Sequence, residues 1–143
     1  LSLPSVSFAE ELLTASPPET IAKFLQDEGL QAKIEKDEDG NPLITSATSG
    51  ANFAIFFHDC TEGKDCSTLL FSACFDLTTP VAVDVMNTWN YNWRFGRAFL
   101  DTTNAPCLQM DIEMLGGISR QAFQTQLTTW MDNLGQFASE VGY

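Results

Sequence analysis

The feature that most constrains the fold is a series of short segments in which apolar and polar residues alternate. In residues 52–58, for example, Phe53, Ile55 and Phe57 occupy every second position. A period of two is typical of a β-strand, because successive side chains point to opposite faces of a sheet. The segments that predict strands are residues 31–36, 43–48, 52–58, 67–77, 97–101 and 106–114.

The first four of these segments follow one another through short turns, such as the acidic turn at 37–42 and the turn at Gly50. Strands joined by short turns become antiparallel neighbours. The sequence therefore predicts an antiparallel meander, followed later in the chain by a separate hairpin formed by 97–101 and 106–114.

A first helix is predicted before the meander. Ser16 has the position of an N-cap, Pro17 that of the first helical residue and Glu19 that of the third residue of a capping box. Gly29 ends this helix. Its expected apolar face consists of Ile21, Ala22, Phe24 and Leu25.

A second helix is predicted between the meander and the hairpin. Thr79 and Pro80 have the pattern of an N-cap and a first helical residue, and Gly96 ends the helix. Its apolar residues recur with helical spacing and are expected to face the sheet. They are Ala82, Val85, Met86, Trp89 and Trp93.

A third helix is expected after Gly116 and Gly117, with Ser119 as its N-cap. At 1.5 Å per residue it is about 33 Å long, which is enough to cross a sheet. Its apolar residues form a narrow stripe, which suits either a sheet or the same helix of a second copy in a homodimer. The stripe is Phe123, Leu127, Trp130, Leu134, Phe137 and Val141.

The predicted element order is αββββαββα. Because the strands occur in a meander and a hairpin rather than in βαβ units, the fold class is α+β, with helices packed against an antiparallel sheet. We expect residues 1–143 to form one domain, in which residues 1–13 are an extended lead-in.

Nineteen acidic residues against seven basic ones give the chain a net charge of −12. Such a surface repels phosphate groups, which argues against nucleic-acid and anionic-membrane partners. No apolar run approaches the roughly 20 residues that span a bilayer, so a soluble protein without membrane insertion is expected.

Four cysteines, an even number, predict disulfides in an exported protein. Cys60 and Cys66 enclose a short polar loop and are expected to pair; the alternative is two free thiols in a cytosolic protein. Cys74 and Cys107 fall on the polar faces of their strands and can pair only if these strands are neighbours. With a leader peptide removed, the protein is expected to be periplasmic or secreted.

The residue types of a catalytic or metal site occur only in unfavourable patterns. His58 and Cys60 come close together in sequence, but the alternation of a strand does not give a base and a nucleophile the required geometry. Asp37, Asp39 and Asn41 resemble the start of a calcium loop that lacks its later ligands, which favours a solvated turn. We expect no cofactor, and no metal because zinc would have too few ligands.

Several stretches together resemble the YbjN-domain family, whose members are described as bacterial sensory-transduction regulators. The resemblance covers residues 14–141 and depends most on 71–77, 87–90, 94–101, 108–111 and 116–119. It implies a fold similar to type III secretion chaperones, and no enzymatic activity, cofactor or catalytic residue. This chain departs from the family pattern at Cys74 and Cys107, so the resemblance implies no role for these two residues.

Four residues in or near these stretches are candidate binding residues. Arg94 and Arg97 could clamp an anion, or pair internally with Asp76, Asp101 or Asp111. Trp89 and Asn90 lie in the second helix; the tryptophan is either core or a ligand platform, and the asparagine either binds a ligand or holds a neighbouring loop.

Three functions remain in competition. The first is a non-catalytic exported module, chaperone-like or sensory, that binds a protein or peptide. The second is a hydrolase that uses Asp76, Asp101 and Asp111, which requires two of these carboxylates to meet in a cleft. The third is a carrier with a closed apolar pocket for a small ligand.

Overall fold

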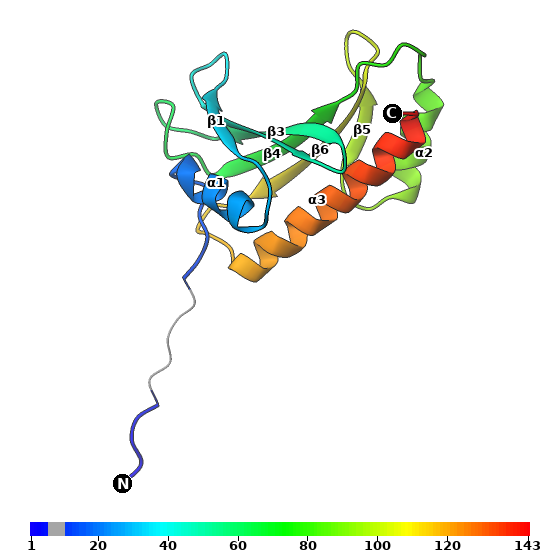
Figure 1. Ribbon diagram of the computed structural model, residues 1–143. Coiled ribbons are helices and arrows are strands. Elements are labelled where there is room, and N and C mark those ends of the chain that lie inside the picture. Colours follow the sequence, from blue (N-terminus) through cyan, green and yellow to red (C-terminus); the bar gives the residue numbers. More distant parts are fainter. Residues whose placement is uncertain (6–10) are drawn as a thin grey trace.

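In the computed structural model, residues 1–5 and 11–143 are described, and they form three helices and one sheet (Figure 1). The elements in chain order are α1 (Pro18–Asp27), β1 (Lys33–Lys36), β2 (Pro42–Thr48), β3 (Ala51–His58), β4 (Thr68–Cys74), α2 (Val83–Asn92), β5 (Arg97–Leu100), β6 (Pro106–Glu113) and α3 (Arg120–Val141). The predicted α+β class and element order are confirmed.

All five pairs of neighbouring strands are antiparallel, and the strand order is β1-β2-β3-β4-β6-β5. The predicted meander and hairpin therefore belong to one six-stranded sheet. After β4 the chain passes through α2, enters the sheet at its far edge as β5, and returns as β6 between β5 and β4. This insertion makes Cys74 and Cys107 directly opposed residues.

One face of the sheet carries the hydrophobic core, and α3 crosses it from end to end (Figure 1). In β3 every second residue from Ala51 to Phe57 is buried, as the alternation predicts. Aromatic rings fill the space below, where Trp130 of α3 lies 5.6 Å from Phe71 and 5.8 Å from Phe53, centroid to centroid. The whole apolar stripe of α3 is buried: Phe123, Leu127, Trp130, Leu134, Phe137 and Val141.

Because this stripe is buried within the chain, it offers no surface to the same helix of a second copy. Of the two uses that the sequence left open for the stripe, packing on the sheet is the one observed, and a homodimer would need another surface. Dimerisation itself stays a prediction. The N-cap of α3 is Ser119, whose side chain accepts a hydrogen bond from the Ala122 amide.

The first helix begins later than predicted. Its N-cap is Pro17, and Ser16, the expected cap, instead donates a hydrogen bond from its hydroxyl to the Cys66 carbonyl, 3.1 Å away. The local sequence has the pattern of an N-cap, but the Ser16 hydroxyl is used in a contact with Cys66, which is 50 positions away in sequence. The expected buried face of this helix is confirmed.

The second helix also begins later, with Ala82 rather than Thr79 as its N-cap, and it ends at Asn92, before Gly96. Met86 and Trp89 are buried, whereas Ala82 is exposed. This helix packs beside β5 and against α3 at one end of the sheet, and α1 lies at the other end (Figure 1).

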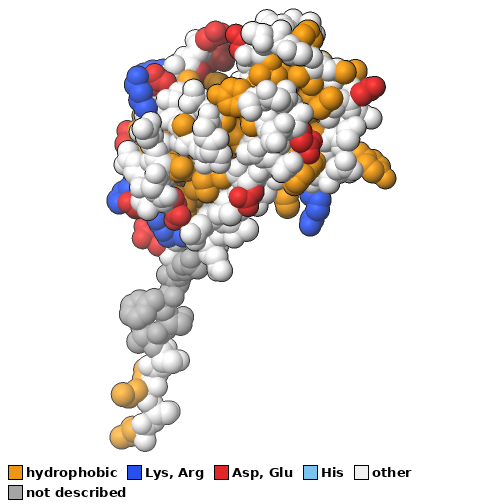
Figure 2. Space-filling model, turned by 45° about the vertical axis from the view of Figure 1, so that its right-hand side comes forward, with side chains coloured by type: hydrophobic (Ala, Val, Ile, Leu, Met, Phe, Trp, Pro, Cys, Tyr) orange, Lys and Arg blue, Asp and Glu red, His pale blue; other side chains and the backbone are white. Residues whose placement is uncertain are grey.

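The predicted lead-in over residues 1–13 includes positions 6–10, which lie outside the described residues. Leu13, just before α1, exchanges backbone hydrogen bonds with Ile118, ahead of α3. No helix within 1–5 and 11–143 has both the length and the apolar character needed to cross a bilayer. Acidic and basic side chains lie scattered among hydrophobic and uncharged ones on the face shown in Figure 2.

Candidate functional site

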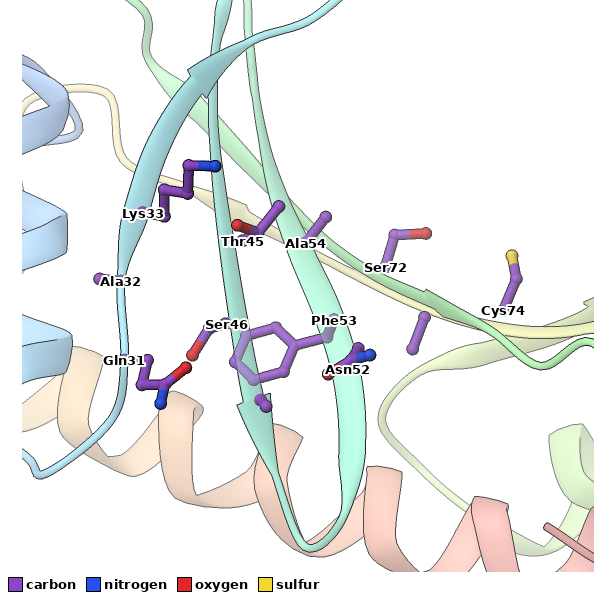
Figure 3. A pocket seen from close by; sticks show the side chains of 12 residues that line it. Gln31, Ala32, Lys33, Thr45, Ser46, Asn52, Phe53, Ala54, Ser72 and Cys74 are labelled. Carbon is purple, nitrogen blue, oxygen red and sulfur yellow. The ribbon is translucent and has the colours of Figure 1, made fainter.

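In the described part of the chain, no helix lies over the second face of the sheet, and this face forms the candidate site (Figure 3). The strand register places side chains there in rows that run across the sheet. One row joins Lys33, Thr45, Ala54, Ser72, Gln109 and Arg97 from one edge to the other. A neighbouring row contains the larger apolar side chains of Leu43, Phe56 and Leu70, all half-buried.

A shallow cavity of about 610 Å³, which we call the trough, lies over β1 to β4 on this face. Its floor contains the short side chains of Thr45, Ala47, Ala54 and Ser72, which leave room above the backbone. Lys33 carries the only charge among the lining residues, and its ammonium lies 3.2 Å from the Glu35 carboxylate. The trough is therefore nearly neutral in a chain of net charge −12.

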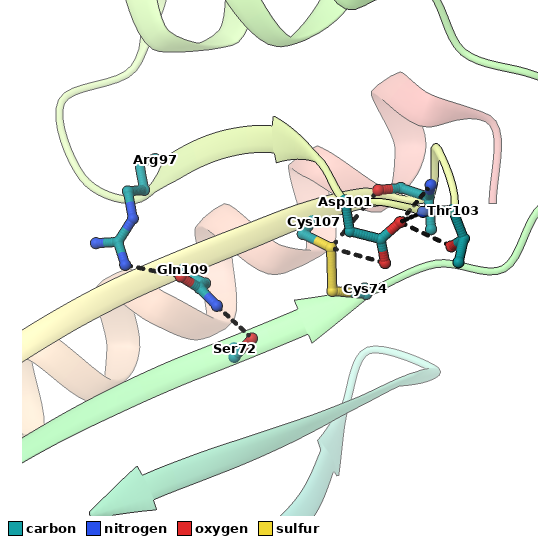
Figure 4. Close-up of a disulfide and its surroundings, with 8 residues drawn as sticks. Ser72, Cys74, Arg97, Asp101, Thr103, Cys107 and Gln109 are labelled. Carbon is teal, nitrogen blue, oxygen red and sulfur yellow. Dashed lines mark hydrogen bonds between the residues drawn. A yellow bond between two sulfur atoms is a disulfide. The ribbon is translucent and has the colours of Figure 1, made fainter. Parts of the chain in front are cut away.

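The end of the trough on β4 is Cys74, whose sulfur is bonded to that of Cys107 at 2.08 Å (Figure 4). Cys74 is exposed, but Cys107 is completely buried. Cys107 shares the face of Gln109, as the alternation along its strand predicts, but at this position the face is covered. The segment after β5 explains the difference, because Asp101 and Ala105 lie against the Cys107 sulfur.

Asp101 is held firmly in this segment. Its Oδ1 accepts hydrogen bonds from the Thr103 hydroxyl at 2.7 Å and from the amides of Thr103 and Ala105. The Thr103 hydroxyl first, and then the amides of Ala105 and Thr103, hold the pKa of Asp101 below its ordinary value. Its other oxygen, Oδ2, lies 4.0 Å from the Cys107 sulfur.

The second disulfide joins Cys60 to Cys66 across the loop between β3 and β4. Cys66 is buried and Cys60 half-buried, so this bond is part of the packed end of the sheet. Two disulfides indicate an oxidising, extracytoplasmic compartment.

Arg97 takes part in a hydrogen-bonded row across the uncovered face (Figure 4). It donates to the Asp111 carboxylate and, at 2.7 Å, to Oε1 of Gln109, whose amide donates to the Ser72 hydroxyl. Arg94 instead lies over the ring of Phe95, 5.2 Å from its centroid. The two arginines therefore do not act together, and an anion-binding role for either stays a prediction.

The other two candidate residues connect α2 to its neighbours. Trp89 is completely buried, stacks on Trp93 with centroids 4.8 Å apart, and points its Nε1 toward the Gly96 carbonyl. The Asn90 side chain both accepts from the Ala98 amide at 2.8 Å and donates to the Ala98 carbonyl at 3.0 Å. These contacts fasten α2 to the edge strand β5, and ligand binding by either residue stays a prediction.

Two of the three carboxylates of the hydrolase hypothesis, Asp101 and Asp111, lie apart, and Asp76 is exposed just after β4. Asp101 lies beside Cys107, whereas Asp111 pairs with Arg97. Asp101 follows Leu100, which pairs with Pro106, and Asp111 lies five residues farther along β6, about 17 Å away at 3.3 Å per residue. Among the described residues, the group of three potential ligands that contains Asp101 includes neither Asp76 nor Asp111.

Within residues 1–5 and 11–143, one group has three potential metal ligands close together, and it consists of Cys74, Asp101 and Cys107. Both of its sulfurs are in the disulfide, so neither is available as a thiolate. His58, at the exposed end of β3, stacks on Phe56 with centroids 6.5 Å apart. Asp37 accepts from the amides of Asp39 and Asn41 and so closes a turn.

Sequence reasoning missed the trough. Its floor residues were visible only as the small or polar partners of core residues, such as Ala54 between Phe53 and Ile55. The signal that could have revealed it is that several strands carry short side chains at the same register, but the register follows from the pairing and not from the individual strands.

A family model described as "Putative bacterial sensory transduction regulator" matches residues 17–142. No curated protein matches the chain. The fold is similar to the crystal structure of YbjN from E. coli, described as "a putative transcription regulator", with a TM-score of 0.66 at 20% identity over 87% of this chain and 90% of that one. With nearly the whole chain matched by the family model, this protein belongs to the YbjN family.

Proposed function

We propose that this protein is a non-catalytic regulatory module that binds an extended, nearly neutral polypeptide segment in the trough. The observation that carries the proposal is the asymmetry of the sheet. Helices cover one face, and the other presents a trough of about 610 Å³ floored by short side chains. Exposed surfaces of this kind, with apolar and polar groups side by side, are typical of protein-interaction sites.

The chemistry of the lining supports a polypeptide as the ligand. Gln31, Thr45, Asn52 and Ser72 offer hydrogen-bonding groups, and Ala47 and Ala54 offer apolar contact between them. The one aromatic residue beside the trough, Phe53, has its ring in the core, which argues against the closed aromatic pocket of a small-ligand carrier. The description of the family as a regulator supports a partner protein rather than a substrate.

The place of action in this proposal is the periplasm or the cell exterior, because both disulfides require an oxidising compartment. We expect purified protein to show no turnover in hydrolase and phosphatase panels. The separation of Asp101 from Asp111 supports this expectation. Reproducible turnover that Asp101→Ala or Asp111→Ala abolishes would contradict it.

A photo-crosslinking side chain at position 54, in an extract of the cells that make the protein, tests the proposal first. The captured polypeptide is then purified and titrated against wild-type protein by calorimetry. Ala54→Arg introduces a long cation into the floor of the trough and should lower the affinity at least about tenfold.

The matched control is Tyr91→Ala, which removes a side chain that is 90% exposed on α2, away from the trough. Its affinity should equal that of the wild type. If Tyr91→Ala weakens binding and Ala54→Arg does not, the helical end of the molecule is the binding surface and the trough is not.

A further inference from the structure

The Cys74–Cys107 disulfide has one accessible end and one inaccessible end. Cys74 is exposed, whereas Cys107 has 0% exposure. A thiolate breaks a disulfide by attacking one of its sulfurs, and the rate depends on access to that sulfur. Attack is therefore restricted to Cys74, and Cys107 is the leaving group.

The direction of attack points to the trough. In thiol–disulfide exchange the incoming sulfur, the attacked sulfur and the leaving sulfur lie in line. The S–S bond runs from β6 toward β4 (Figure 4), and β3 is the next strand on the far side of β4. The trough lies over β1 to β4 and ends at Cys74. An incoming thiolate thus reaches Cys74 from within the trough.

The sheet also opens at this end of the trough. The ladder between β3 and β4 ends at the pair Ala54 and Ser72, so Asn52 and Cys74 are not paired across it. Figure 3 shows the two strands diverging there. Asn52, Ser72 and Cys74 all line the trough, so a peptide side chain that lies there reaches Cys74 beside the hydrogen-bonding groups of Asn52 and Ser72.

We infer that Cys74 is an exchange site for the thiol of a cysteine-containing peptide seated in the trough, which it captures as a mixed disulfide. This inference rests on the proposed binding face and adds the chemical nature of the ligand. The capture is stoichiometric, so it is compatible with a module that turns over no substrate.

The exchange step is balanced without a further oxidant. The S–S bond between Cys74 and Cys107 breaks while a new one forms between Cys74 and the incoming cysteine. Cys107 leaves with the bonding electron pair as a thiolate and takes up one proton, equal to the proton that the incoming thiol lost. The peptide thiol is oxidised and Cys107 is reduced.

Asp101 acts on this step as a positioning residue. Its Oδ1 is fixed by the hydrogen bonds within the turn, and its Oδ2 lies 4.0 Å from the Cys107 sulfur. A carboxylate beside a developing thiolate opposes its formation. Asp101 therefore slows the opening of the disulfide, and Asp101→Asn is expected to accelerate it about tenfold.

The test uses the oxidised full chain with two probes: reduced glutathione, and a short neutral peptide that contains one cysteine. The reactions are quenched with acid and the adducts located by peptide mass mapping. Both probes should modify Cys74, the peptide faster than glutathione, and at least about tenfold faster than either probe modifies the Cys60–Cys66 pair. A first adduct on Cys60, Cys66 or Cys107 would overturn the inference.

Three variants sharpen the test. Ala54→Arg should slow the peptide more than glutathione, Tyr91→Ala should change neither rate, and Asp101→Asn should accelerate both. Equal rates for the two probes, unchanged by Ala54→Arg, would overturn recognition by the trough. A partner that binds in calorimetry but forms no adduct through its cysteine would overturn the exchange site and leave the proposed function standing.

Discussion

The two faces of the sheet differ in the interactions that their side chains make. Beneath the covered face, Phe71 and Trp130 belong to a core of side chains that are almost completely buried. On the uncovered face, the same strands carry short or half-buried side chains, and polar contacts such as the row from Arg97 to Ser72 replace apolar packing. The apolar core beneath the covered face supplies most of the stability, so the side chains of the uncovered face are less constrained by packing.

Phe71 and Leu70, neighbours on β4, test this difference most directly, because their side chains point to opposite faces. Phe71→Ala should lower the free energy of unfolding by about 3–5 kcal/mol, because it leaves a cavity in the core. Leu70→Ala should cost about 1 kcal/mol, since its half-buried side chain loses little contact. Chemical denaturation of both variants measures the difference, and equal costs would contradict it.

The two disulfides lie at opposite ends of β4, and their contributions to stability can be compared in the same way. Cys74 and Cys107 are 33 residues apart in sequence, and Cys60 and Cys66 are 6 apart. In the loop-closure view, replacing the first pair with alanine should cost about 4 kcal/mol and the second about 2 kcal/mol. Denaturation of the two double variants decides between this order and its reverse.

The mass of the unreduced protein after alkylation checks the pairings that this prediction needs. No alkylated cysteine is expected before reduction. Two labelled thiols at either pair would remove the basis for the corresponding stability change.

Ser46 gives a change of opposite sign. Its hydroxyl is buried on the covered face and has no hydrogen-bond partner among residues 1–5 and 11–143, which costs free energy in the folded state. Ser46→Ala should therefore raise the free energy of unfolding by about 1 kcal/mol. Thr45→Ala, one position away on the uncovered face, should lower it by about 0.5 kcal/mol. A destabilised Ser46→Ala protein would show that the hydroxyl is satisfied.

Much of the covered face could be predicted from the sequence. The alternation in residues 52–58 and the apolar stripe of α3 predict from the sequence alone which side chains are buried. Local periodicity is sufficient here, because burial against any partner leaves the same pattern.

The uncovered face could not be predicted in the same way. The insertion of β6 beside β4 depends on tertiary packing, and it alone brings Cys107 opposite Cys74. The burial of Cys107 arises from the segment around Asp101, and the loss of the Ser16 cap from a contact with Cys66. Each of these outcomes depends on residues far apart in sequence, about which a local pattern holds no information.

Acid provides the smallest and most local test, because it acts on Asp101 and not on the packing of Phe71 against Trp130. Since the folded-state pKa of Asp101 is lowered, its carboxylate contributes stability that is fully present above the unfolded value of about 3.9. That contribution is lost as the pH falls through the lower folded value. A carbon-detected NMR titration should show Asp101 titrating below its ordinary value, and Thr103→Ala should raise the midpoint because the mutation removes the strongest hydrogen-bond donor to the carboxylate. An unchanged midpoint in Thr103→Ala would mean that the turn amides alone hold the carboxylate beside Cys107.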